Sequence, residues 1–283
     1  MHKVSAVVLC YNQWNLLIDC VESIKAQTHQ VSEIIIIDDN SLDYNKVFEE
    51  NFCKDYILFY RNSENKGRGF CRNLAIKVCK SDYVFFCDST NIACKYFVEK
   101  ALASFTNKNI ASVGGRILDG VKTSFFSQSW RNRHLFKSEH DYGTSTHNAS
   151  SLNTYGVLIN CNAVKRIGNF NPSLRHSEDR DLGKRLLNAG YKIIGDPNLI
   201  VYSIKKDSVL SVLERYWRWY GGTDEKFTLK DYWHAIKASF RPMMQEDIKA
   251  KDWRSVFISF LCPHYGFLRH LYRKISGKIQ KLS

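Results

Sequence analysis

Short apolar runs alternate with helix-like patterns through residues 4–203 of the chain. The apolar runs predict strands at 4–10, 33–38, 57–60, 83–87, 111–117, 155–160 and 192–202. Apolar residues that recur at helical spacing predict helices at 14–25, 69–79, 95–105 and 178–189. Strands that alternate with helices are typical of an α/β domain whose mostly parallel sheet is flanked by helices.

Residues 119–152 break this rhythm because they are rich in Ser, Thr, Asn and His, with isolated aromatic residues such as Trp130. A polar stretch of this length predicts a lid or a binding loop. His134, His140 and His147 lie within it at spacings of 6 and 7, which do not match a metal-ligand pattern. We interpret these three histidines as polar loop residues.

The composition changes after residue 204. Hydrophobic residues make up 44% and charged residues 24% of the 283 residues, as in an ordinary globular chain, but the net charge is +13. Residues 205–283 hold 16 Lys or Arg against 8 Asp or Glu, which predicts a surface for an anionic partner. We therefore divide the chain into an α/β domain at 1–204 and a basic, aromatic-rich helical extension at 205–283.

The extension shows two helical stripes. Apolar residues from Trp253 to Leu261 predict a helix that Pro263 ends. A second stripe, opposite a row of Lys and Arg, runs over 264–283. It predicts attachment to an anionic membrane surface or, as the alternative, a core stripe with a solvated basic face.

Other features indicate a cytoplasmic protein. The nine cysteines include no CxxC pair, which favours free thiols in a reducing compartment and argues against zinc. No apolar run is long enough to span a bilayer, and the first residues lack a signal-peptide pattern. With the stripe at 264–283, we expect a cytoplasmic protein that binds peripherally to the inner face of the cell membrane.

Polar side chains follow three of the predicted strands, namely Tyr11 and Asn12, then Asp38 and Asp39, then residues 88–90. Ligands of open α/β sheets bind beyond the carboxyl ends of the strands, so these residues are candidates for one site. Taken singly, each is equally an ordinary turn or cap residue.

The segment NKGRGFCRN at 65–73 places two glycines and two arginines at a predicted helix start. Backbone amides at such a start suit an anion. The alternative is a plain turn that leads into a helix, since isolated glycine patterns are permissive.

A further acidic group opens the helix that Ser177 should cap. Glu178 and Asp179 stand in its first turn, where the helix dipole favours acidic residues. Helical spacing places Asp179 on the side of Leu182 and Leu186, so its carboxylate should point inward. An inward carboxylate at a helix start is a candidate general base.

These blocks, in this order, resemble the family 2 glycosyltransferases, which are inverting enzymes of the GT-A fold. The resemblance covers roughly residues 4–203 and rests on five segments: VSAVVLCYNQWNLLIDCVESIKAQT, EIIIIDDNSLD, NKGRGFCRN, DYVFFCDST and GNFNPSLRHSEDRDLGKRL.

The resemblance implies roles for residues of the nucleotide site. Tyr11 and Asp39 would contact the nucleotide base, with Asp38 as a neighbour, and Arg72 would lie near the nucleotide. The family's DxD signature falls at 88–90.

Two catalytic residues are implied as well. The family's ED pair falls at Glu178 and Asp179, and in that family the aspartate acts as the catalytic base. We assign Asp179 this role, with Glu178 beside it.

Two departures weaken the metal site that the resemblance implies. The signature reads Asp88-Ser89-Thr90, and Ser203 stands where many relatives carry a histidine. The loss of a carboxylate and an imidazole should weaken binding of Mg²⁺ or Mn²⁺. Three alternatives stay open: Asp88 and Thr90 with the diphosphate hold a metal weakly, nearby cations replace it, or catalysis is impaired.

Candidate cations lie close to the end of the domain. RYWRW at 215–219 resembles the QxxRW motif of processive members, and guanidinium groups bind diphosphates well. We predict that Arg218, helped by Lys205 or Lys206, binds the diphosphate. The alternative is an aromatic helix whose arginine stems cover apolar surface.

By resemblance, we expect an inverting glycosyltransferase of hexosyltransferase type that moves a sugar from a nucleotide-diphosphate donor, UDP-linked, to an acceptor hydroxyl in bacterial surface polysaccharide or glycan synthesis. The acceptor, a glycan or a lipid-linked sugar, would meet Trp130 and Trp219. The alternative is a non-catalytic homologue that binds a nucleotide sugar or glycan as a partner subunit. No nucleic-acid-reading motif is present, so we expect no nucleic acid partner.

Overall fold

The computed structural model describes residues 2–44, 46, 49–50, 56–121, 125–136, 143–220 and 227–279, with side chains as far as residue 275. The chain forms two compact units. The first comprises Met1–Val121 and Lys137–Lys205, and the second comprises Lys122–Phe136 and Lys206–Ser283.

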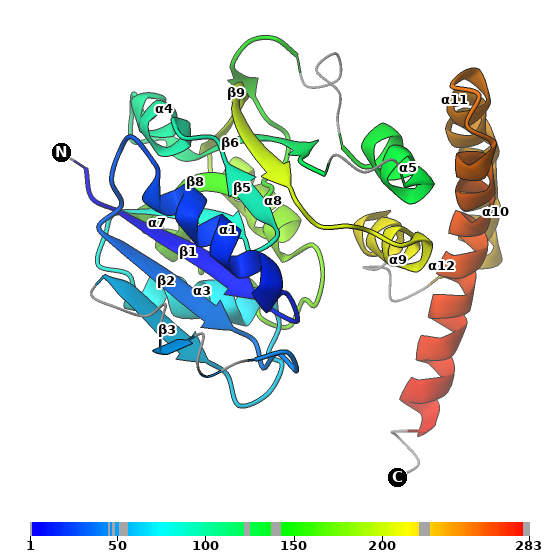
Figure 1. Cartoon of the computed structure of the whole chain (residues 1–283), viewed down its shortest axis with the longest axis horizontal. Coiled ribbons are helices and arrows are strands. Elements are labelled where there is room, and N and C mark those ends of the chain that lie inside the picture. Colours follow the sequence, from blue (N-terminus) through cyan, green and yellow to red (C-terminus); the bar gives the residue numbers. More distant parts are fainter. Residues whose placement is uncertain are drawn as a thin grey trace. The chain divides into compact units, whose positions relative to one another are not determined.

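One sheet forms the first unit, with strand order β3-β2-β1-β4-β8-β6-β9-β5 and β7 paired to β9 (Figure 1). Its strands are β1 (Val4–Cys10), β2 (Glu33–Asp38), β3 (Ile57–Arg61), β4 (Tyr83–Asp88), β5 (Asn91–Ala93), β6 (Ile110–Asp119), β7 (His147–Asn148), β8 (Gly156–Asn160) and β9 (Lys192–Ser203). The strands from β3 to β4 run parallel, whereas β8 runs antiparallel to both of its neighbours.

Helices cover both faces of this sheet. They are α1 (Trp14–Lys25), α3 (Arg68–Val78), α4 (Phe97–Ala103), α7 (Cys161–Arg166) and α8 (Glu178–Asn188). Successive residues of a strand point to opposite faces, and β4 shows this plainly. Phe86 joins the core under α3, α7 and α8, whereas Phe85 packs against Phe97 of α4 at 4.9 Å between ring centroids. The predicted α/β sheet flanked by helices is thus confirmed.

The structure adds elements that the sequence pattern did not predict. The short strand β5 and the short helix α7 follow directly after longer strands. Residues 119–152 were predicted as one long loop, but they contain α5 (Phe126–His134) and β7. Of the histidines in that stretch, His134 lies on α5, His147 lies on β7, and His140 lies outside the described residues.

The second unit is helical. It contains α5, α9 (Val209–Tyr220), α10 (Leu229–Ala238), the π-helical turn η1 (Ser239–Met243), α11 (Met244–Lys249) and α12 (Trp253–Ile279). Its interior includes Trp130, whose indole N–H donates to Ser259 Oγ at 2.8 Å. In the part of the chain that the structure describes, no helix combines the length and apolar content needed to cross a bilayer.

Pro263 does not end its helix, which corrects the sequence prediction, because α12 continues to Ile279. Proline has no N–H to donate to the carbonyl group four residues earlier, which here is Ser259. That carbonyl oxygen instead accepts a hydrogen bond of 2.6 Å from Ser239 Oγ. The missing bond is therefore replaced from a neighbouring helical turn, and the helix passes through the proline.

The second apolar stripe lies on the exposed side of α12. Leu268, Leu271 and Ile275 are 61%, 45% and 52% exposed. On the opposite side, the guanidinium groups of Arg269 and Arg273 lie 4.8 and 4.3 Å from the ring centre of Trp217 on α9. Within the described residues the stripe is therefore not a core stripe, and these two arginines are packed against a ring instead of forming a fully solvated face.

Candidate active site

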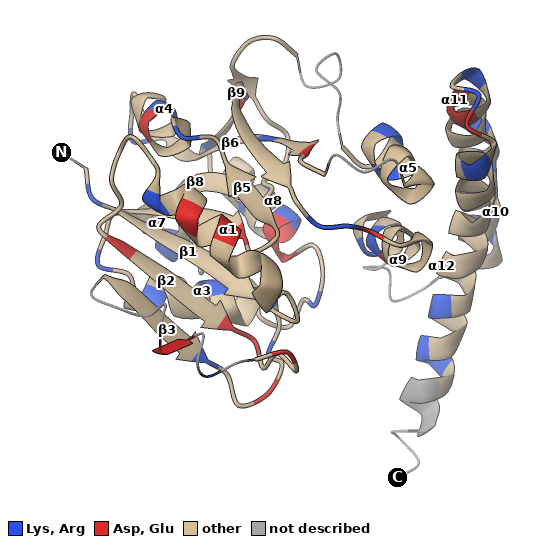
Figure 2. Ribbon diagram, viewed as in Figure 1, with Lys and Arg blue, Asp and Glu red and all other residues tan. Residues whose placement is uncertain are grey.

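The carboxyl ends of β1, β2 and β4 meet at one edge of the sheet because these strands are parallel. Gly156 pairs with Cys87, so antiparallel β8 begins at the same edge. The residues that follow β1, β2 and β4 therefore lie at the same edge as the residues that precede β8. Figure 2 shows acidic residues gathered there, beyond the end of β2.

Asp38 holds the loops of this edge together. Its carboxylate accepts hydrogen bonds from Trp14 Nε1 at 3.2 Å, from the N–H of Ser41 at 3.2 Å and from the Ser41 hydroxyl group. It also forms an ion pair with Arg61 and is fully buried. A carboxylate engaged by these donors has little capacity left for a ligand, so we assign Asp38 a role in loop structure.

Asp39 organises the segment that leads into α3. Its carboxylate accepts hydrogen bonds of 2.8 Å from the N–H groups of Lys66 and Gly67 and from Asn62 Nδ2. Gly67 has a φ of 87°, a backbone conformation that glycine adopts without strain. Asp39 is 6% exposed, so it is a buried anchor of the loop at which the nucleotide base was predicted to bind.

Tyr11 lies beside this anchor and is 48% exposed. The next residue, Asn12, ties the loop after β1 to the loop after β2. Its N–H donates to Ser41 Oγ at 2.9 Å, and its Oδ1 accepts from the N–H of Leu42 at 2.7 Å. The ring of Tyr11 is thus presented from a fixed backbone, while its contact with a nucleotide base stays a prediction.

Arg72 connects three elements of the edge. It is 2% exposed, and its guanidinium forms a buried ion pair with Glu178 at the start of α8. Its second terminal nitrogen lies 3.9 Å from Asp88 Oδ1 at the end of β4. The structure therefore brings together Arg72, Asp88 and Glu178, residues that are distant in the sequence.

Asp179 stands next to this ion pair. Its carboxylate accepts hydrogen bonds from Thr154 Oγ1 at 3.2 Å and from the N–H of Arg180 at 2.8 Å. The residue keeps some exposed surface, yet burial of its carboxyl group raises the pKa of Asp179, and the negative charge of Glu178 raises it further. Arg72 opposes this increase without cancelling it. The result is a carboxyl group that holds a proton more readily than an ordinary aspartate.

Ser177 precedes α8 as predicted, but it does not cap the helix with its side chain. Its φ is 59° and its hydroxyl group makes no capping hydrogen bond. The first turn of α8 is held instead by the side-chain contacts of Glu178 and Asp179 with Arg72 and Thr154.

Arg68 is a further cation of the edge that the sequence interpretation did not single out. It is exposed at the first position of α3. Desolvation lowers the pKa of its guanidinium, but the carboxylates of Asp88, Glu178 and Asp179 outweigh this effect and raise it. The segment NKGRGFCRN contained the signal, since it carries two arginines. The family position drew attention to Arg72 alone.

The donor set around Asp88 does not fit a resident Mg²⁺ or Mn²⁺ ion. Asn91 pairs with Ser203, and the N–H of Ile204 donates to the Thr90 carbonyl at 2.9 Å, so the Asp88-Ser89-Thr90 segment lies beside the end of β9. There the hydroxyl group of Ser203 is buried and has no hydrogen-bond partner among the residues that the structure describes. Among the described residues, no group of three His, Cys, Asp or Glu could hold a metal ion. One carboxylate beside an arginine is a poor ligand set for a hard dication.

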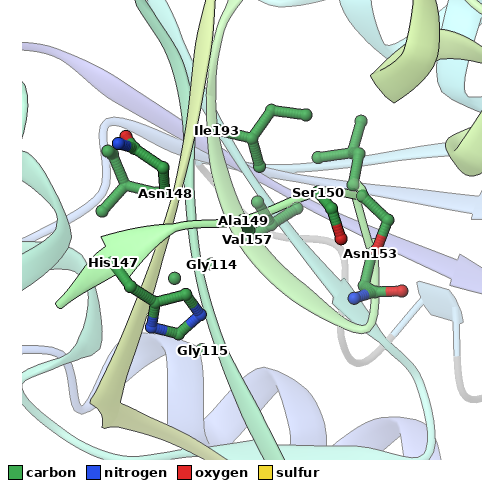
Figure 3. A pocket seen from close by; sticks show the side chains of 13 residues that line it. Gly114, Gly115, His147, Asn148, Ala149, Ser150, Asn153, Val157 and Ile193 are labelled. Carbon is green, nitrogen blue, oxygen red and sulfur yellow. The ribbon is translucent and has the colours of Figure 1, made fainter. Parts of the chain in front are cut away.

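A pocket opens between β6, β7, β9 and the loop that leads into β8 (Figure 3). Its polar side chains are His147, Asn148, Ser150, Ser151 and Asn153. Its described lining residues include no Asp, Glu, Lys or Arg, and glycines form part of its floor. At Gly195 an added Cβ atom would lie 2.7 Å from His147 Nε2, so the imidazole ring packs directly against the backbone of this glycine. The lining includes Asn153, which directly precedes Thr154, the partner of Asp179.

The predicted diphosphate cations lie on both units. Lys205 is half-buried after β9 in the first unit, whereas Lys206 begins the second. Arg218 lies half-buried on α9 of the second unit. Arg215, in the place of the motif's glutamine, forms an ion pair of 2.8 Å with Asp207. The roles of Lys205, Lys206 and Arg218 at a diphosphate stay predictions.

The predicted acceptor platform at Trp130 is not supported by the structure. Its ring is fully buried and packs against Tyr216, at 5.9 Å between centroids, within the second unit. A stacking platform requires an exposed ring face, which Trp130 lacks. Trp219, on α9, is half-buried, and its role at an acceptor stays a prediction.

Comparison with known proteins gives consistent matches. The model of "Glycosyl transferase family 2" matches residues 5–168, which is more than half of the chain. An uncharacterized glycosyltransferase of Rickettsia felis is 33% identical over 134 residues, covering 44% of this chain and 22% of that protein. A poly-beta-1,6-N-acetyl-D-glucosamine synthase of Staphylococcus epidermidis is 24% identical over 299 residues, covering 98% of this chain and 69% of the synthase.

Solved structures support the same fold. A mannosyltransferase from Pyrobaculum calidifontis, in complex with GDP-Man and Mn²⁺, superposes with a TM-score of 0.58 at 12% identity, covering 100% of this chain and 81% of that one. The match to the Rickettsia felis protein spans less than a quarter of that protein's length. From the family match and this structural likeness, the chain belongs to glycosyl transferase family 2 and has a GT-A-like fold.

Proposed function

We propose that this protein transfers a sugar from a nucleotide-diphosphate donor, UDP-linked, to an acceptor hydroxyl group with inversion at the anomeric carbon. The proposal rests on the surroundings and the raised pKa of the Asp179 carboxyl group. This group is positioned by Thr154 and lies next to the buried pair of Arg72 and Glu178. Such a group accepts a proton in the course of a reaction more readily than a carboxylate neutralised by an ion pair.

The transfer is a single displacement. The acceptor oxygen attacks the anomeric carbon while Asp179 removes its proton, and the bond from that carbon to the diphosphate oxygen breaks. Attack from the side opposite the leaving group inverts the configuration. Negative charge grows on the departing diphosphate, and we assign its stabilisation in the first unit to Arg68 and Lys205. The roles predicted for Lys206 and Arg218 stay predictions.

The pocket beside Thr154 suits the sugar ring of the acceptor. Its amide and hydroxyl side chains, such as Asn148, Ser150 and Asn153, form hydrogen bonds with sugar hydroxyl groups without demanding a charge. The loop that carries these residues also contains Thr154, which hydrogen-bonds to Asp179, so we propose that a sugar bound in the pocket is held near the proton acceptor. An acceptor glycan of neutral sugars therefore fits this position better than a charged one.

A nucleotide-sugar panel tests the proposal. Thermal melting of the full chain with UDP, GDP, dTDP and CMP sugars should show a rise in melting temperature with one nucleotide class, since a ligand that binds only the folded state stabilises it. Slow release of the nucleotide diphosphate should accompany binding even without acceptor. If no nucleotide sugar raises the melting temperature, the proposal is wrong.

Arginine and lysine side chains, rather than a bound metal ion, should support much of this activity. We expect part of the donor turnover to persist in excess EDTA, because the edge supplies Arg68 and lacks a full set of metal ligands. Replacement of Arg68 by Met should weaken donor binding about tenfold, the loss expected for one charge-assisted contact. Complete loss of turnover in EDTA that Mn²⁺ restores would contradict this assignment.

The alternative function is that of a non-catalytic partner subunit. It is motivated by the same two departures from the family's metal site, at Thr90 and Ser203. It predicts that a nucleotide sugar raises the melting temperature while no nucleotide diphosphate is released, with or without Mn²⁺. Donor hydrolysis therefore separates the two functions in one assay.

We also propose that α12 attaches the protein to an anionic membrane surface. The exposed stripe of Leu268, Leu271 and Ile275 supplies apolar contact, and Lys274 lies on the same exposed turn of the helix. Figure 2 shows the basic residues along this part of α12. Replacement of the three apolar residues by Ser should reduce sedimentation with phosphatidylglycerol vesicles, while phosphatidylcholine vesicles should bind neither form. Unchanged sedimentation of the variant would refute the attachment.

A further inference from the structure

Two cysteine thiols lie side by side at the edge of the sheet opposite the candidate active site. Cys79 follows the last residue of α3, and Cys161 begins α7 directly after β8. Because β8 is antiparallel to β4, its end lies beside the beginning of β4, far from the carboxyl ends that carry the site. The two Sγ atoms are 3.9 Å apart.

The surroundings of the two thiols are unequal. Cys161 is 2% exposed, and its N–H donates to the Asp82 carbonyl oxygen at 2.9 Å. Cys79 is only half-buried, and its Sγ lies 3.3 Å from the Ile76 carbonyl oxygen. Because Cys79 is the more exposed of the two residues, we expect a small reagent in water to reach it before it reaches Cys161.

A hydrogen bond and a nearby positive charge lower the pKa of the Cys79 thiol and so favour its reactive thiolate form. The hydrogen bond from Cys161 lowers the pKa of Cys79 most, and the ammonium group of Lys165 lowers it further, while burial and the carboxylate of Glu33 oppose them. The same pairing and burial raise the pKa of Cys161. The thiolate is the nucleophilic form of cysteine, so Cys79 is the attacking thiol of the pair.

From this geometry we infer that Cys79 and Cys161 form an oxidative modification site, at which hydrogen peroxide converts the two thiols into a disulfide. The Cys79 thiolate attacks one oxygen of the peroxide, the O–O bond breaks, and the products are a sulfenic acid at Cys79 and, after protonation, water. The Cys161 sulfur then attacks the Cys79 sulfur and displaces the sulfenic oxygen as a second water. Two thiols lose two electrons in total, and one peroxide gains them.

Only a small movement is needed for the second step. A disulfide has a sulfur–sulfur distance of about 2.05 Å, so the two atoms must approach by about 2 Å. Both residues stand at helix ends, Cys79 after α3 and Cys161 at the start of α7.

A second thiol pair provides a control within the same chain. Cys20 and Cys87 share a hydrogen bond, but they are 0% and 2% exposed. That hydrogen bond and burial raise the pKa of the Cys87 thiol well above its ordinary value. This pair has proximity without access or thiolate character, so it should stay reduced in the folded protein.

The bond would close a loop from residue 79 to residue 161. Cross-links that close long loops remove much conformational freedom from the unfolded chain, so the oxidised protein should melt at a higher temperature. Because the site lies at the opposite edge from Asp179, nucleotide-sugar binding is not required for this effect.

The test uses the full chain treated with graded hydrogen peroxide, then alkylated and digested without reduction for mass spectrometry. We expect a cross-linked peptide that joins Cys79 to Cys161, at several times the yield of any link between Cys20 and Cys87, together with a rise in melting temperature that dithiothreitol reverses. In the variant Cys161→Ser, the sulfenic acid at Cys79 should persist and be trapped by dimedone.

Two results would overturn the inference. One is oxidation of Cys79 to the sulfinic acid in the folded wild-type chain without a link to Cys161. The other is a link whose yield is no higher in the folded chain than in urea, which would show that the native geometry does not direct it. Both readouts use the wild-type protein, so they hold even if Cys161→Ser unfolds.

Discussion

Two aspartates, one in each unit, have pKa values that are shifted in opposite directions. In the first unit, burial raises the pKa of Asp179, and Glu178 raises it further. In the second unit, burial alone would raise the pKa of Asp247, but hydrogen bonds from His134 and Ser259 outweigh it and lower the pKa. The residue type is the same, so the difference arises from the neighbours.

The neighbours of Asp247 are all donors. Its carboxylate contacts His134 Nε2 at 2.8 Å and Ser259 Oγ at 2.5 Å, and it forms an ion pair with Arg133. The carboxylate thus joins α5, α11 and α12 as a fixed negative charge. Asp179, by contrast, receives one hydroxyl and one backbone N–H, and Arg72, which lowers its pKa, is already paired with Glu178.

A buried carboxylate stabilises a fold when donors saturate it and is available for chemistry when they do not. The donors on Asp247 favour its charged form, whereas Asp179 has fewer donors and can accept a proton.

The largest effect should come from Asp179→Asn. Loss of the proton acceptor should reduce donor turnover by about 10²–10⁴-fold, because a general base typically contributes that much, while the melting temperature rise with donor should persist. Asp181→Asn is the matched control, since Asp181 lies two residues along the same helix and pairs with Arg185 at 2.8 Å. Unchanged turnover in Asp179→Asn would remove this residue from the mechanism.

The next largest effect should come from Asp247→Asn, on stability. The change leaves Arg133 and His134 facing a neutral amide in a buried site, which should cost about 3 kcal/mol of the free energy of unfolding. Urea unfolding followed by tryptophan fluorescence measures it. Glu246→Gln on the same helix is the control, because Glu246 is 48% exposed and should change stability by less than about 0.5 kcal/mol. Equal costs for both variants would contradict the comparison.

A smaller effect should appear in acid. Because the pKa of Asp247 is lowered by folding, its stabilisation is complete above the pKa of an unfolded aspartate, about 3.9, and is lost as the pH falls through the lower folded value. The difference in unfolding free energy between the wild type and Asp247→Asn should therefore shrink below about pH 4. A difference that stays constant down to pH 2 would show that the charge of Asp247 is not what stabilises the unit.

The smallest effect concerns the pH dependence of turnover. Because Glu178 raises the pKa of Asp179, the acid limb of kcat/KM should lie above the range of an ordinary aspartate. Glu178→Gln removes that negative charge, while Arg72 stays cationic and lowers the pKa of Asp179. The acid limb of kcat/KM should therefore move to lower pH. Movement of the limb to higher pH would contradict the assignment, and thermal melting of the variant checks that it is folded.

The sequence predicted the sheet better than the helical unit. Strands such as β2 and β4 are almost wholly buried, so their apolar runs are unambiguous. The helix α5 was predicted as a loop because buried polar residues such as Gln128 and Arg131 obscure its apolar side. The course of α12 through Pro263 depends on a hydroxyl group from Ser239, and no pattern local to the proline contains it.

At the candidate site, the sequence identified residues but not how they are used. Asp38 and Asp39 were both predicted near a nucleotide, yet Asp38 is saturated by Trp14, Ser41 and Arg61, which are contacts between distant segments. The pair of Arg72 with Glu178 likewise joins α3 to α8 through the folded sheet. Hydrogen-bond saturation is a property of the tertiary structure, so residue spacing alone could not reveal it.

A carbon-13 NMR titration of the aspartate carboxyl groups measures whether the pKa of Asp179 is raised while that of Asp247 is lowered. The variants Asp179→Asn and Asp247→Asn assign the two signals by their absence. We expect the Asp179 signal to titrate above the ordinary aspartate value and the Asp247 signal below it. An Asp179 signal that titrates at or below the ordinary value would contradict its assignment as the proton acceptor.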